Sequence, residues 1–456
     1  MSSVNDAPTL LPPPPVRPTP PRHLFFRTAH GWLDSFGADA FELPALERRL
    51  LWRRNLVVSD PAAIRHVFLD NAVNYTKTAI ARRLLEPGLG KGLITLEGEA
   101  WRRHRKIMAP AFDPPSIAQH VPAMVAAARD LGARWTTLSD GTVVDMVQEM
   151  RRSTLAIIAR TMFSADSGGM VDLVAHTVER YVAGIRIGPL DLLGLPDWFP
   201  RWLQRRNAHR AFGDLSRAIA AIIDARRHAP GSVGSDLLGR LIAARTDETG
   251  APLPEDEIQA EFVTIFMAGH ETTALALSWT WYLLALHPEA HDAVEAELAR
   301  VLGGRDPEPA DVPRLTYTRM AIDEALRLYP PAHTLSRQAL GPDEVAGHRV
   351  AKSSIVFVMP WILHRHRRLW DAPEKFRPER FSGAEAAARP RFAYLPFGAG
   401  PRVCIGASFA LTEAVVVLAT LAQRFRPRLV PGVEIEPAGL ITLRPKNGMP
   451  MTLTRR

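Results

Sequence analysis

The longest helical segment of the sequence limits the folds that this chain can adopt. It runs from about Pro254 to His287. Proline fits a first helical turn, the acidic residues 255–257 suit the positive end of the helix dipole, and His287-Pro288 ends the pattern. At 1.5 Å per residue, its roughly 33 residues span about 50 Å. We therefore predict one helix that crosses the whole molecule.

The apolar part of this segment, Phe262–Leu286, is long enough by count to cross a bilayer. Its middle, however, holds His270 and Glu271 followed by two threonines, and a charged residue at that depth costs several kcal/mol. The first 21 residues contain no apolar run of the kind that signal peptides have. We expect a buried helix in a cytoplasmic protein without a membrane anchor.

The rest of the chain divides into a short arm and one continuous fold. Seven of the ten residues 12–21 are proline, which predicts an extended arm over residues 1–21. Residues 22–456 show no internal repeat and are expected to form a single, mainly helical domain. The expected strands are Phe41–Leu46 and Leu50–Val58, the expected helices Ala123–Trp135, Val143–Phe163, Thr318–Leu328 and Ala407–Phe425, and the expected terminal hairpin Gly439–Leu443 with Met449–Thr454.

Composition excludes several classes of protein. Hydrophobic residues make up 46% and charged residues 23% of the 456 residues, which is typical of a globular chain. The single cysteine, Cys404, excludes an intramolecular disulfide. The net charge of +8 permits a nucleic acid, an anionic membrane or an acidic protein as partner. Zinc-finger spacing, RNA-motif aromatics and basic heptads are missing, so we expect no nucleic-acid partner.

The segment Phe397–Gly406, of sequence FGAGPRVCIG, carries the most specific pattern. A lone cysteine is by default a small buried apolar residue. Here three glycines allow the backbone to fold tightly around a sulfur and to approach a flat cofactor, and a helix is expected to start directly afterwards. A helix N-terminus and nearby cations lower the pKa of a thiol, which a metal-binding thiolate requires.

This F-G-x-G-x-R-x-C-x-G spacing resembles the haem-ligand loop of the cytochrome P450 superfamily. The resemblance implies a mainly α fold with a small β-rich region, the triangular prism of that family, and haem b as cofactor. It implies that Cys404 is the iron ligand, that Phe397 neighbours its sulfur, that Arg402 faces a haem propionate and that Gly406 lets the loop turn closely around the sulfur.

A second motif, Ala268–Thr273, lies in the middle of the long helix. Taken alone, it fits a kinked core helix in which Thr272 bonds back to the carbonyl of Ala268. It also resembles the family's oxygen-activation segment, which implies that Thr272 holds a water and that Glu271 relays protons. Ala268 and Gly269 then leave room for dioxygen. A zinc-protease motif is excluded because Ala274 stands where the second histidine is needed.

Further resemblances extend over nearly the whole chain. Glu324 and Arg327 with Arg380 match the family's E-x-x-R and P-E-R-F elements, which implies a buried structural network. Trp101 and Arg105 match its W-x-x-x-R helix, where both meet a haem propionate. The resemblance also makes Arg337, after the proline turn, a propionate partner, because arginine can grip a carboxylate with two hydrogen bonds.

Together these features predict a monooxygenase that uses O₂ and two electrons to hydroxylate or epoxidise an apolar small molecule, such as a terpenoid, a fatty acid or an aromatic compound. The haem domain fills the chain, so we expect a separate redox partner, a ferredoxin with its reductase. Two basic clusters suggest where an acidic ferredoxin could dock. They are Arg102, Arg103 and Lys106, and Arg365, Arg367 and Arg368.

Two alternatives remain open from the sequence. The nearer one is a peroxygenase of the same fold, which uses H₂O₂ without a redox partner; the presence of both Glu271 and Thr272 argues against it. The more distant one is a protein without enzymatic activity, either a haem sensor or a basic binding protein. No output module of the kind that a sensor needs is visible in the sequence.

Overall fold

The computed structural model describes residues 33, 36–50, 53–163, 213, 217, 219–228, 236–245, 250–439 and 441–456. The predicted arm at residues 1–21 lies outside them. The chain forms two compact units. The larger unit contains the described residues up to Thr76 together with Met124–Ser153 and Thr272–Arg456, and the smaller unit contains Lys77–Ala123 and the described part of Thr154–Glu271.

The long helix predicted from the sequence is α10 (Glu255–Leu286). Its bounds differ from the predicted ones by one residue at each end, because Pro254 and Pro288 mark both ends. Residues 255–271 of α10 belong to the smaller unit and residues 272–286 to the larger one. Among the described residues, no helix is both long and apolar enough to cross a membrane.

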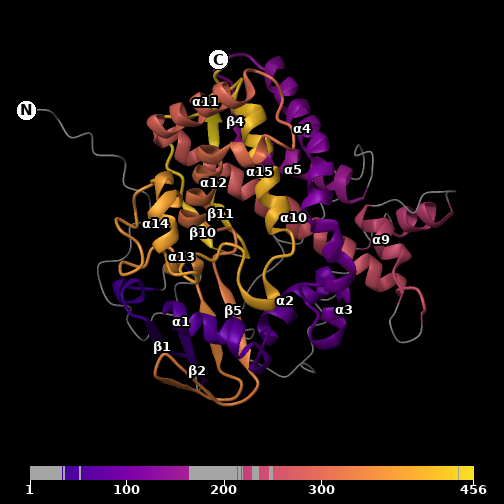
Figure 1. Ribbon diagram of the computed structural model, residues 1–456, viewed down its shortest axis with the longest axis vertical. Coiled ribbons are helices and arrows are strands. Elements are labelled where there is room, and N and C mark those ends of the chain that lie inside the picture. Colours follow the sequence, from indigo (N-terminus) through magenta and orange to yellow (C-terminus); the bar gives the residue numbers. More distant parts are fainter. Residues whose placement is uncertain are drawn as a thin grey trace, which may run out of the picture. The chain divides into compact units, whose positions relative to one another are not determined.

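In its described residues, the larger unit consists of helices and four sheets (Figure 1). Its helices are α1 (Pro61–Arg65), α11 (Pro288–Leu302), α12 (Thr316–Leu328), α13 (Pro360–Leu363), α14 (Gly383–Ala388) and α15 (Ala407–Ala422). Two more helices, α4 (Pro114–Thr137) and α5 (Met146–Met162), are shared between the units.

The main sheet has the order β1-β2-β8-β5-β3, and its strands are antiparallel except for the parallel pair β2 and β8. Its strands are β1 (Ala45–Leu50), β2 (Arg53–Val58), β3 (Tyr75–Thr76), β5 (Leu335–Ala339) and β8 (Ile355–Val358). A core of buried aliphatic and aromatic residues, including Ile64, Val67 and Val356, packs between this sheet and the segment 61–69.

The smaller sheets complete this unit. One is the hairpin of β6 (Asp343–Val345) and β7 (His348–Val350), and another is that of β10 (Pro437–Gly439) and β11 (Leu443–Pro445). The third, of order β4-β12-β9, contains β4 (Val143–Asp145), β12 (Pro450–Thr452) and β9 (Arg428–Leu429).

Several expected boundaries were wrong. The helix α4 starts at Pro114 instead of Ala123, α15 ends at Ala422 instead of Phe425, and Leu50 belongs to β1 instead of the following strand. Phe41 lies in a 3-10 helix (Ala38–Phe41), because the N–H groups of residues 42 and 43 bond back to Asp39. Val143–Asp145 forms strand β4 instead of a first helical turn. The terminal hairpin is also different: Gly439 ends β10 and Leu443 begins β11, these two strands pair with each other, and β12 pairs with β4 and β9.

The smaller unit is helical. It contains α2 (Ala79–Leu89), α3 (Gly98–Met108) and α9 (Leu237–Ala243), with parts of α4, α5 and α10. Two glycines before α3 allow the loop at residues 90–92 to press against α10. A Cβ on Gly92 would lie 2.1 Å from the Thr264 hydroxyl, and one on Gly90 would lie 3.0 Å from the Cβ of Ala260.

Candidate active site

The loop that carries Cys404 is closed by its own backbone. The N–H of Cys404 donates to the carbonyl of Phe397 at 2.9 Å, and the N–H of Val403 donates to that of Gly400 at 3.1 Å. Gly398 and Gly400 both have positive φ values, +74° and +68°, which other residues rarely adopt. The thiol of Cys404 is exposed, and α15 begins three residues later.

Gly400 has a second reason to be glycine, since it packs directly on the backbone of the segment 66–70. A Cβ at Gly400 would lie 1.7 Å from the carbonyl oxygen of Phe68, which is far closer than a Cβ atom can approach another heavy atom. The guanidinium of Arg337, on β5, lies 4.5 Å from the centre of the Phe68 ring. Phe68, which the sequence analysis missed, therefore joins the cysteine loop to a predicted propionate partner.

The middle of α10 changes from buried to partly exposed. Residues 260–266 are buried, whereas Met267, Ala268, Gly269 and Thr272 are partly exposed. Glu271, between them, is buried. Gly269 is also needed for packing, because a Cβ there would lie 2.7 Å from the Cδ1 of Ile158.

The helix α3 holds Trp101 and Arg105 one turn apart, with the Arg105 guanidinium 5.9 Å from the centre of the Trp101 ring. Between them, His104 is buried against α10. Its Nδ1 lies 2.6 Å from Oε1 of Glu261, and its Nε2 lies 2.9 Å from Oε2 of Glu257. Sequence analysis missed His104, because its partners lie more than 150 positions away.

The predicted network of Glu324, Arg327 and Arg380 is confirmed, and all three side chains are fully buried. Arg327 donates to both oxygens of Glu324, from Nε at 2.6 Å and from Nη2 at 2.8 Å. Nε of Arg380 donates to Oε1 of the same carboxylate at 2.9 Å. Burial lowers the pKa of Arg380, and the charge of Glu324 opposes that shift.

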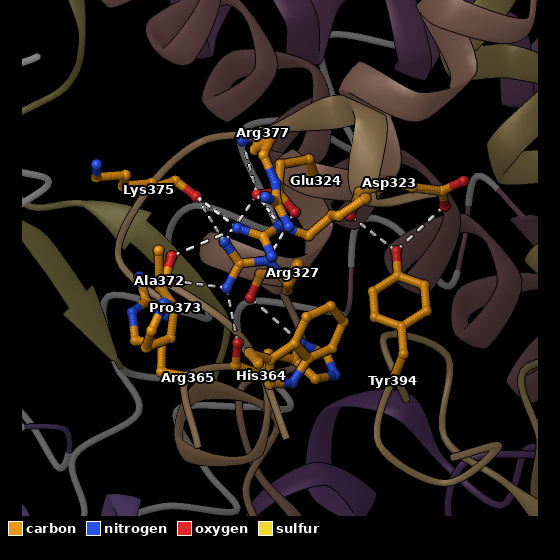
Figure 2. A network of polar contacts seen from close by, with 12 residues as sticks. Asp323, Glu324, Arg327, His364, Arg365, Ala372, Pro373, Lys375, Arg377 and Tyr394 are labelled. Atoms are coloured by element: carbon orange, nitrogen blue, oxygen red, sulfur yellow. Dashed lines mark hydrogen bonds and ion pairs between the residues drawn. The ribbon is translucent and has the colours of Figure 1, made fainter. Parts of the chain in front are cut away.

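Figure 2 shows that this network extends to the segment 364–375, which precedes the cysteine loop. Arg327 donates to the carbonyls of His364 and Pro373, each at 2.7 Å, and to that of Lys375 at 3.0 Å. The Nε2 of His364 accepts from the N–H of Leu395 at 2.9 Å. Burial holds the pKa of His364 well below its usual value, so the ring is neutral and can accept this bond.

The predicted site residues belong to both compact units. Those of the smaller unit are Trp101, Arg105, Ala268, Gly269 and Glu271; those of the larger unit are Thr272, Arg337, Phe397, Arg402, Cys404 and Gly406.

One of the two predicted basic docking clusters is partly wrong. Arg365 is buried, with its guanidinium 3.8 Å from the centre of the Trp361 ring, so it cannot belong to a docking surface. Arg367 pairs with Glu42. In the other cluster, Arg102 pairs with Glu99 and Arg103 with Glu257, which reduces the local positive charge.

Comparison with known proteins gives the class. The sequence profile of the family Cytochrome P450 matches residues 39–449. Cyclooctatin synthase of Streptomyces melanosporofaciens is 37% identical over 87% of this chain and 86% of its own length. Pentalenene oxygenase of Streptomyces avermitilis is 32% identical over 87% of both chains. The crystal structure of the cytochrome P450DA heme domain superposes with a TM-score of 0.81, at 25% identity, over 97% of this chain and 98% of the other.

The chain therefore belongs to the cytochrome P450 family. It is a monooxygenase with haem b as its cofactor, and the predicted fold class is confirmed. The residues present fit that cofactor: the cysteine loop offers a thiol next to a helix N-terminus, the combination that favours a thiolate ligand. The close packing of Gly400 against the Phe68 carbonyl holds this loop in place.

Proposed function

We propose that this enzyme hydroxylates or epoxidises a cyclic terpenoid, with Cys404 as the ligand of the haem iron. The observation that carries the site assignment is the exposed thiol of the chain's single cysteine, held by a glycine-turned loop at the start of α15. The relatives favour a terpenoid over other apolar substrates. One of them is named pentalenene oxygenase, and pentalenene is a cyclic terpene hydrocarbon.

Four of the predicted residues would bind the propionates of the haem. Arg337 and Arg402, with Trp101 and Arg105, would hold the haem propionates, because guanidinium groups form paired hydrogen bonds with carboxylates. Phe397 and Gly406 would shape the loop around the sulfur. The bound haem supplies the activation of O₂, favoured by the electron density that a thiolate ligand provides.

The protein's own contribution to oxygen activation is proton delivery from α10. Thr272, at the partly exposed stretch of the helix, would hold a water by its hydroxyl, and the buried Glu271 would supply protons to that water. Positioned acid–base groups of this kind accelerate reactions by about 10²–10⁴-fold. Ala268 lies one turn before Thr272, and its small side chain would leave room for dioxygen on this face of the helix.

We propose an acidic ferredoxin with its reductase as the electron source. Lys106 and Arg102, on the exposed part of α3, are the basic residues that support docking. Their effect is weaker than the sequence suggested, because Glu99 and Glu257 lie beside this cluster. The cytoplasmic location also remains a prediction.

Replacing Thr272 by alanine tests the proton-delivery part of the proposal. The variant T272A is expected to form less product per electron and to release more H₂O₂. Without the Thr272 hydroxyl, the water that delivers protons would no longer be held in place, so reduced oxygen would leave as peroxide. The measurement is the ratio of product to reductant consumed, with peroxide determined in parallel.

A matched control is T280A, two turns further along α10. The Thr280 hydroxyl is buried and donates to the carbonyl of Ala276 at 2.7 Å, so its loss perturbs the same helix without touching the motif. Unchanged coupling in T272A would remove Thr272 from the mechanism. Efficient turnover of wild-type enzyme with H₂O₂ alone, and none with reduced ferredoxin, would favour the peroxygenase alternative.

A further inference from the structure

The helix α5 contacts α10 directly before Glu271. The Thr154 hydroxyl donates to the backbone carbonyl of His270 at 2.8 Å, and both residues are buried. One turn further along α5, Ile158 packs so closely against Gly269 that a Cβ on this glycine would lie 2.7 Å from the Cδ1 of Ile158. These residues belong to the smaller unit, although 116 positions separate Thr154 from His270. A polar and an apolar contact therefore join α5 to two consecutive residues of α10.

The carbonyl that Thr154 contacts belongs to the peptide group between His270 and Glu271. In an α-helix such an oxygen accepts from the N–H four positions further on, and its second lone pair can accept from a hydroxyl of a neighbouring helix. The His270 side chain bonds back to its own helix, with Nδ1 2.8 Å from the carbonyl oxygen of Phe266. Thr154 thus contacts the backbone directly before Glu271, the residue that supplies protons in the proposed mechanism.

We propose that Thr154 is a positioning residue for proton delivery: its hydroxyl fixes the orientation of the 270–271 peptide group, and thereby the direction of the Glu271 side chain. A peptide group is planar, so a bond that fixes its carbonyl also fixes the place of the next Cα. A misplacement of about 1 Å in a catalytic group can lower a rate by about 10²-fold. The proposal rests on the proposed function, because Thr154 acts through Glu271 and not on the reacting atoms.

Nuclear magnetic resonance of the haem-loaded enzyme tests the hydrogen bond without any turnover. The chain contains 15 histidines, and only His270 is followed by a glutamate. Labelling the carbonyl carbon of histidine with ¹³C and the nitrogen of glutamate with ¹⁵N therefore produces one directly bonded labelled pair, that of the 270–271 peptide. The reduced, CO-bound enzyme is measured because it is diamagnetic.

The variant T154V keeps the shape of the side chain and lacks the hydroxyl. It is expected to shift the labelled carbonyl resonance upfield, because a carbonyl that loses a hydrogen bond is less polarised. T154S keeps the hydroxyl and should leave the resonance near its wild-type position. An unchanged resonance in T154V would show that Thr154 does not hold this carbonyl, and would overturn the proposal.

Thr161, on the same helix, provides a matched control. Its hydroxyl is buried and donates to the carbonyl of Ile157 at 2.7 Å, so T161V removes a buried hydroxyl from α5 and leaves the bond to His270 in place. The labelled resonance is expected to stay at its wild-type position in T161V. An equal shift in T154V and T161V would mean that any change in α5 disturbs α10, and would contradict a specific role of Thr154.

The positioning role is measured as the product formed per electron. T154V is expected to lower this ratio several-fold, whereas T154S and T161V should retain most of it. Because Thr154 acts through Glu271, adding T154V to E271Q should cause little further loss. Three results would each overturn the positioning role: equal retention in T154V and T161V, equal loss in T154V and T154S, or the same loss from T154V with and without E271Q.

A failure of the proposed function gives a different result. E271Q would then form as much product per electron as wild type, and the positioning role would fall with it, whereas the resonance shift in T154V would still show the bond between α5 and α10. If T154V does not fold, T154A replaces it in both experiments, because it also lacks the hydroxyl and places no methyl group against the carbonyl.

Discussion

Replacing Glu324 by glutamine is expected to prevent the accumulation of folded, haem-loaded protein. The change keeps the size of the side chain and removes the charge that bonds both Arg327 and Arg380, whose side chains are fully buried. Their carbonyl acceptors remain, but a buried cation without its anion costs about 3–5 kcal/mol. That is a large fraction of the roughly 5–15 kcal/mol by which a domain is stable.

The measurement is the haem-to-protein ratio and the urea midpoint of purified E324Q. E436Q is a matched control, because Glu436 makes an ion pair with Lys446 at 2.9 Å but with about half of each side chain exposed. An exposed pair contributes about 0–1 kcal/mol, so this variant should resemble wild type. Equal midpoints for E324Q and E436Q would show that the buried network does not stabilise this fold.

Replacing His104 by glutamine is expected to produce the second large loss of stability. Both ring nitrogens of His104 lie within hydrogen-bond distance of carboxylate oxygens, which accept hydrogen bonds, so both nitrogens must carry protons. The ring is therefore an imidazolium. Its removal leaves Glu261, which is fully buried, without a cation, at a cost of about 3–5 kcal/mol.

This contribution depends on pH in a predictable direction. Burial lowers the pKa of His104, but the hydrogen bond and charge of Glu261, together with those of Glu257, raise it more, and the net pKa lies above its usual value. The stabilisation is complete below the unfolded pKa of about 6.5 and disappears as the pH rises through the folded value. The difference in urea midpoint between wild type and H104Q should shrink accordingly.

Arg103 supplies the control for this prediction. It pairs with the same Glu257 at 2.9 Å, but about a third of its side chain is exposed. R103Q should therefore lose far less stability than H104Q, and without the same pH dependence, since arginine does not titrate in this range. A difference between wild type and H104Q that grows with pH would mean that His104 is neutral in the native protein.

The elements that could be predicted from the sequence are those with local signals. The bounds of α10 follow from its two flanking prolines and its acidic first turn, and the pairing of Glu324 with Arg327 follows from helical spacing. The terminal strands were misassigned because a β-propensity pattern does not say which strand is the partner. Residues 450–452 pair with segments about 20 and 300 positions away.

Long-range contacts also explain what the site analysis missed. The bond from Leu395 to His364 and the seat of Gly400 on Phe68 depend on folded positions that no motif encodes. The prediction that Arg365 belongs to an exposed docking cluster failed for a related reason. Arg365 stands in a basic run that is typical of an exposed surface, yet the aromatic rings of Trp361 and Tyr329 cover its guanidinium.

The central claim is that Cys404 binds the haem iron as a thiolate. The most direct test is the absorption spectrum of the purified protein after reduction with dithionite and exposure to CO. The expected result is the strongly red-shifted Soret band that gives the family its name, and the loss of this band in C404S. A CO band at the position typical of histidine ligation, or folded protein without haem, would show that Cys404 does not bind the iron as a thiolate.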